Sequence, residues 1–115
     1  MITAIDDASE AEHIKALLRV DILRDGWSTV RVGRTPHPLA FDVFLVVDGA
    51  EHYVTNLNLA AERMNVFYFQ LPKWVSGDRV GIVFRPSARA ARFSVDLTQY
   101  WNGTIEFKDL PVQKN

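Results

Sequence analysis

Residues 41–55 have the sequence FDVFLVVDGAEHYVT, and this stretch decides the fold class. Phe41 to Val47 is an apolar and β-branched run that only Asp42 interrupts, and a second run of strand-forming residues occupies 52–55. Such side chains pack well on a pleated surface, so both runs favour β-strands. Asp48-Gly49 between them is typical of a tight turn. The stretch therefore predicts a central β-hairpin.

Alternating apolar and charged residues continue on the N-terminal side, at 18–22 and 30–32. A three-residue connection of Asp25, Gly26 and Trp27 keeps apolar residues opposite apolar ones. That connection predicts a hairpin whose cross-strand pairs are Ile22 with Val30, Asp21 with Arg31 and Val20 with Val32. The alternative continues a helix through Ile22 to Leu23 and ends it near Gly26.

Further strands are predicted on the C-terminal side, at 65–69, 80–84, 93–97 and from Ile105 onward. Asn102-Gly103 is the strongest short hairpin signal in the chain, because both residues accept positive φ in a type I′ turn. The apolar alternation breaks after Leu97, which predicts a bulge or a change of sheet there. Residues 56–63 indicate a loop with a helical turn.

A short N-terminal helix is predicted over 9–18. Ser9 and Glu12 have the spacing of a capping box, and Ile14, Leu17 and Leu18 follow at helical spacing. The 115 residues fit one domain, 1–115. Turn signals about eight to twelve residues apart indicate an antiparallel sandwich or a closed barrel. We favour an all-β, mainly antiparallel β-sandwich of seven to eight strands over 19–112, with the helix before it.

Composition excludes several classes of site and partner. Thirteen Lys and Arg nearly balance 14 Asp and Glu, so no overall positive field is available to attract nucleic acid. The absence of cysteine excludes disulfides, thiolate nucleophiles and cysteine-ligated metals. No run approaches the roughly 18 apolar residues of a membrane span, which predicts no membrane insertion. The acidic N-terminus does not resemble a secretory signal, so the chain as written is expected to be cytoplasmic unless a leader or parent protein was removed.

The three tryptophans, Trp27, Trp74 and Trp101, all fall in or beside predicted turns. Exposed indole rings there would offer a stacking surface for sugars, and the alternative is that they fold over the ends of the sandwich and are buried.

Four arginines, Arg79, Arg85, Arg89 and Arg92, lie in a stretch that contains no acid. Guanidinium groups bind carboxylates and phosphates, so this stretch is a candidate surface for an acidic protein partner, and the alternative is an ordinary solvated connection.

Metal, cofactor and catalytic sites find no support in the sequence. His13, His37 and His52 have no ligand spacing, and Asp42, Asp48, Asp78 and Asp96 show no calcium-loop regularity. No serine lies in a nucleophile elbow. Asn102-Gly103-Thr104 fits the N-glycosylation pattern, but the hairpin explains the same Asn-Gly.

We therefore expect a domain that is not an enzyme, binds no metal or cofactor, and acts as a non-catalytic binding or assembly module, part of a larger protein or complex. Its expected partner is another protein or a second copy of itself, bound through an edge strand or the arginine surface. The alternative is a carbohydrate-binding module that uses the tryptophans.

Overall fold

The computed structural model describes residues 12–35, 39–87 and 104–114. These residues are mostly β, as predicted, and very little of them is helical. Their seven strands are β1 Leu18–Leu23, β2 Ser28–Val32, β3 Leu39–Val47, β4 Ala50–Leu59, β5 Asn65–Phe69, β6 Arg79–Pro86 and β7 Ile105–Gln113.

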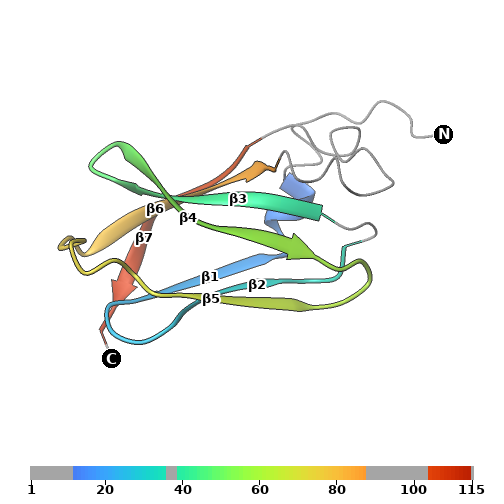
Figure 1. The fold of residues 1–115 in the computed structure, drawn as a ribbon, viewed down its shortest axis with the longest axis horizontal. Helices are drawn as coiled ribbons and strands as arrows, with labels where there is room; N and C mark the ends of the chain where they lie inside the picture. Colours follow the sequence, from blue (N-terminus) through green and yellow to red (C-terminus); the bar gives the residue numbers. More distant parts are fainter. Residues whose placement is uncertain (1–11, 36–38, 88–103, 115) are drawn as a thin grey trace.

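The strands form one sheet in the order β4-β3-β6-β7-β1-β2-β5, which curls until its end strands β4 and β5 approach each other. In Figure 1, β3 and β4 lie above β1, β2 and β5. The shape is nearly that of a barrel, and the finer expectation of a mainly antiparallel sandwich is not confirmed. Five neighbouring pairs are antiparallel, but β1 and β7 pair in parallel through Ile22–Val112 and Leu23–Gln113. This pairing joins the first strand to the last, so no hairpin turn in the sequence could reveal it.

The core lies between the upper and lower strands and is built by their alternation. On β3, Phe41, Val43 and Leu45 are fully buried, and the rings of Phe41 and Phe84 meet edge to face with centroids 6.0 Å apart. On β2, Val30 and Val32 are buried in the same core. The alternation predicted at 18–22 and 30–32 is therefore confirmed, because its apolar residues face the core and its charged residues face outward.

The central hairpin is confirmed in detail. Asp48 and Gly49 have φ values of 50° and 79°, as a two-residue type I′ turn requires, and Val47 pairs with Ala50. A register shift leaves Val54 as an extra residue on β4, a bulge that the sequence did not predict. The predicted loop at 56–63 is wrong in its first half, because β4 continues to Leu59.

The β1–β2 hairpin exists, but its register differs by two residues from the prediction. Val20 pairs with Val30, and Arg19 pairs with Arg31, so each side chain keeps its predicted face. The connection is four residues long, 24–27, because the hydroxyl of Ser28 accepts a hydrogen bond from the Leu23 amide at 2.9 Å.

The N-terminal helix ends earlier than predicted. Within the described residues it covers 12–15, and β1 begins at Leu18, so the alternative of a helix through Leu23 is wrong. The Leu17 amide donates to the Ile14 carbonyl and closes the last turn. The Leu17 carbonyl then accepts a hydrogen bond from the amide of Gly33, the residue after β2, and β1 begins at the next residue. Residues 9–11, the predicted strand at 93–97, its bulge near Leu97 and the Asn102-Gly103 turn lie outside the described residues.

Candidate functional site: the outer face of β1, β2 and β5

Among the described residues, large apolar side chains are exposed mainly on one side. Of the six found there, four lie on β5 or next to it, and we call these four the apolar row: Trp27, Met64, Val66 and Tyr68. The other two, Tyr53 and Trp74, belong to β4 and to the loop before β6. Such clustering differs from the scattered apolar residues that any protein surface carries.

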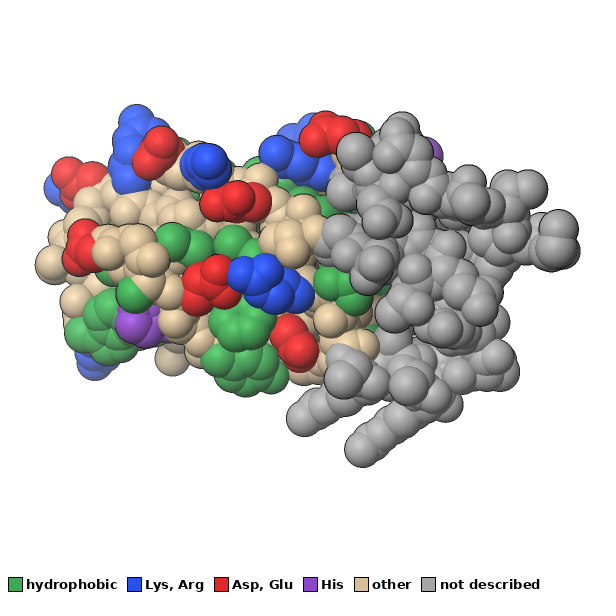
Figure 2. Space-filling model, turned by 90° about the horizontal axis from the view of Figure 1, so that it is seen from above, with side chains coloured by type: hydrophobic (Ala, Val, Ile, Leu, Met, Phe, Trp, Pro, Cys, Tyr) green, Lys and Arg blue, Asp and Glu red, His purple; other side chains and the backbone are tan. Residues whose placement is uncertain are grey.

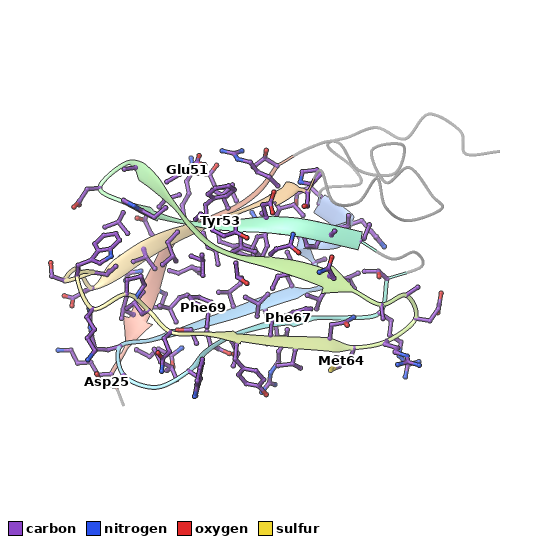
Figure 3. The ribbon with its side chains drawn as sticks, viewed as in Figure 1. Asp25, Glu51, Tyr53, Met64, Phe67 and Phe69 are labelled. Carbon is purple, nitrogen blue, oxygen red and sulfur yellow. The ribbon has the colours of Figure 1, made fainter. Side chains whose placement is uncertain are left out.

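The sequence of β5 explains the apolar row. Four of its five residues, NVFYF, are apolar, so both faces of the strand are apolar. Phe69 is buried and Phe67 packs against the core, whereas Tyr68 is 62% exposed on the opposite face. Figure 3 shows Phe67 and Phe69 directed between the upper and lower strands and Met64 on the other side of β5. Met64 and Tyr68 are therefore about 13 Å apart along the strand.

Trp27 extends the apolar row beyond the end of β2. Its indole is 56% exposed, and Trp27 and Tyr68 together line a shallow apolar hollow. Tyr68 is placed there by the pairing of β5 with β2, in which Thr29 is opposite Tyr68 and Arg31 is opposite Val66. β5 ends the order of strands in the described sheet, so its second edge has no neighbouring strand paired to it there.

An arginine pair borders the apolar row. Arg19 of β1 lies directly opposite Arg31 of β2, both side chains are exposed, and Arg31 is in turn opposite Val66. Within residues 12–35, 39–87 and 104–114, no carboxylate forms an ion pair with either guanidinium. Asp21 lies on the same face, where its carboxylate accepts a hydrogen bond from Gln113 at 3.4 Å. Like charges directly opposite each other on a sheet repel, so this pair lowers the stability of the domain.

Replacing Arg31 with glutamate is expected to raise the free energy of unfolding by about 0.5 kcal/mol, since an attraction to Arg19 would replace a repulsion. Urea unfolding at low ionic strength measures the change. The gain should shrink in high salt, which screens exposed charges. Arg31→Gln is the matched control and should gain less, because it removes the repulsion without adding an attraction. A less stable R31E protein would contradict the proximity of the two guanidinium groups.

The two described tryptophans are both half exposed, so the alternative in which they are buried does not hold for them. They do not share a platform. Trp27 borders Tyr68 of β5, whereas Trp74 meets the ring of His52 on β4 edge-on, with centroids 4.6 Å apart. Trp101 lies outside the described residues.

The two described arginines of the predicted anion surface hold partners from their own chain. Arg79 donates to the carbonyl of Asp109 at 2.8 Å, and Arg85 pairs with Glu51 and donates to the Thr104 hydroxyl at 3.2 Å. They are six residues apart on β6, or about 20 Å, so they form no common patch. Basic and acidic side chains are interspersed on this upper side in Figure 2. Arg89 and Arg92 lie outside the described residues.

Other surfaces of the described residues are weaker candidates for a binding site. Two further hollows are lined by side chains of both charges, among them Lys108 and Glu106, and so carry little net charge. In the described ranges, no group of three or more His, Cys, Asp or Glu is placed to hold a metal ion. No helix found there has the length and apolar character needed to cross a membrane.

Sequence reasoning singled out Trp27 but missed Met64, Val66, Tyr68 and the arginine pair. The signal for the apolar row was present, because a strand that is apolar on both faces must expose one of them unless something covers it. Comparison with protein-family models, with curated proteins and with solved structures finds no match for this chain.

Proposed function

We propose that this domain is a non-catalytic binding domain that holds a protein partner through the outer face of β1, β2 and β5, as part of a larger protein or complex. The observation that carries this proposal is the apolar row, four neighbouring large apolar side chains that remain exposed on and beside an end strand. Exposed apolar clusters of this kind mark interaction sites.

The residue types on this face also suit a protein interface. Aromatic residues, methionine and arginine are enriched at such interfaces, and Trp27, Tyr68, Met64 and Arg31 supply all of them within one face. Tryptophan, tyrosine and arginine are also the side chains that most often dominate binding energy. Both a different protein and a second copy of the chain are partners that this face suits.

The experiment compares Tyr68→Ala with Tyr53→Ala. Tyr53 is a matched control, because it is 58% exposed but lies on β4 among the upper strands. Peptides selected from a random displayed library report heterologous binding, and sedimentation reports self-association. We expect Tyr68→Ala to lower the affinity for the selected peptide, or the strength of self-association, about ten-fold or more, the size of an interface hot spot. Equal behaviour of the two variants, or the absence of both kinds of association, would overturn the proposal.

Carbohydrate binding is the second candidate function, and the half-exposed rings of Trp27 and Trp74 favour it. A glycan array tests it directly. Sugar binding that is lost in Trp27→Ala or Trp74→Ala would support stacking on that ring. If no glycan on the array binds, carbohydrate binding is excluded as a function and protein binding remains the proposal.

A further inference from the structure

We infer that the outer face of β1, β2 and β5 binds an extended acidic polypeptide segment, with its carboxylates on Arg19 and Arg31 and its apolar side chains against Val66 and Tyr68. This inference rests on the proposed function and names the chemistry of its partner. The supporting observation is charge complementarity: two adjacent exposed guanidinium groups have no ion-pair partner among the described residues.

The register places charge and apolar surface in the same rows. One row across the three strands is Arg19, Arg31 and Val66, and the next is Asp21, Thr29 and Tyr68. Neighbouring strands are about 4.8 Å apart, so Arg19 lies roughly 10 Å from Val66 across the sheet. A carboxylate over the arginines and an apolar group over β5 therefore fit one short segment.

The width of this row indicates that the segment lies over the face. A strand added at the free edge of β5 would be about 14 Å from Arg19, three strand spacings away and beyond the reach of its side chain. An extended segment that follows the strands presents side chains on one side about every 6.6 Å, so a carboxylate at the row of Arg19 and Arg31 is followed by an apolar side chain at the row of Tyr68. Guanidinium groups bind carboxylates with two parallel hydrogen bonds, so they discriminate an acid from its amide.

Single-stranded nucleic acid is the competing class of ligand, because aromatic rings and arginines also bind it. The observations favour the acidic peptide. Asp21 lies on the same face, and a phosphate backbone would need a track of cations where the rows supply two.

The experiment uses the full chain and three synthetic probes: a designed peptide, its glutamine analogue, and oligothymidylate. In the designed peptide, glutamate, valine and tyrosine occupy every second position with serine between them, so that all three lie on one side of the extended segment. Fluorescence anisotropy measures each affinity at low and high salt. We expect the glutamate peptide to bind about ten-fold more tightly than the glutamine analogue. The double variant Arg19→Gln/Arg31→Gln should abolish that difference, because it weakens the binding of the glutamate peptide far more than the binding of the glutamine analogue. Lys108→Gln, an exposed cation on β7, is the control and should preserve the difference.

Three results would overturn the inference: no binding of the glutamate peptide, equal binding of both peptides, or tighter binding of oligothymidylate. The Tyr68→Ala variant separates this inference from the proposed function. If the two peptides bind equally but Tyr68→Ala weakens both, the face is a protein interface without acid preference. If Tyr68→Ala binds every probe as the unsubstituted chain does, the proposed function fails as well.

Discussion

Replacement of Phe84 by alanine is expected to lower the free energy of unfolding by about 3–5 kcal/mol. Phe84 is fully buried on β6, which pairs with β3 on one side and with β7 on the other. Its ring meets Phe41 and Phe107 edge to face, with centroids 6.0 and 6.1 Å away. The truncation removes these contacts and leaves a cavity that a paired central strand cannot easily close. Urea unfolding followed by far-ultraviolet circular dichroism measures the loss.

Val66→Ala is the control for this experiment, because Val66 is exposed on the end strand β5. Its loss should cost less than about 1 kcal/mol, the range of strand propensity alone. Should F84A unfold at the same urea concentration as the unsubstituted chain, the assignment of the core to the inner face of β6 would be wrong. The expected loss in F84A is a large fraction of the roughly 5–15 kcal/mol by which a typical domain is stable, so the variant tests the fold as a whole.

Local pattern predicted the parts of the fold that local chemistry determines. Asp48-Gly49 specified its turn because both residues tolerate positive φ, and the alternation at 18–22 and 30–32 specified which side chains of the first hairpin face the core. The register of the β1–β2 hairpin could not be predicted to the residue. Parity excludes odd shifts, which would exchange the two faces, but it permits a shift of two. The Ser28 hydroxyl and the pairing of Ile22 and Leu23 with β7 select between the remaining registers.

Strand order lies beyond such reasoning, because it depends on contacts between residues far apart in the chain. The pairing of β1 with β7 joins Ile22 to Val112, and no local signal connects them. The candidate site depends on strand order in the same way. Alternation predicted that Arg31 faces outward, but the end position of β5 and the row from Arg19 through Arg31 to Val66 require the whole sheet. Trp27 could be singled out as a candidate site residue from the sequence alone, because its place beside the predicted Asp25-Gly26 turn does not depend on strand order.

The hairpin loop that carries Trp27 depends on one buried hydroxyl. Ser28 is fully buried, and its Oγ accepts a hydrogen bond from the Leu23 amide at 2.9 Å across the base of loop 24–27. Arg24 ties the same loop to the segment before β6, since its guanidinium donates to the carbonyls of Val75 and Gly77. The backbone amide of Arg24 also donates to the Gln113 carbonyl at 2.8 Å. The position of Trp27 beside Tyr68 therefore follows from polar contacts at the loop base.

Ser28→Ala is expected to lower the free energy of unfolding by about 1–3 kcal/mol, because the Leu23 amide loses its acceptor where little water can replace it. Urea unfolding measures the global loss, and hydrogen exchange of the Leu23 amide should accelerate by more than exchange in β3. Ser76→Ala, at an exposed serine of the segment before β6, is the matched control and should change stability by less than about 0.5 kcal/mol. Unaltered exchange at Leu23 in S28A would show that the hydroxyl is not its acceptor. Weakened peptide binding in S28A at temperatures where the sheet stays folded would connect loop order to the Trp27 end of the apolar row.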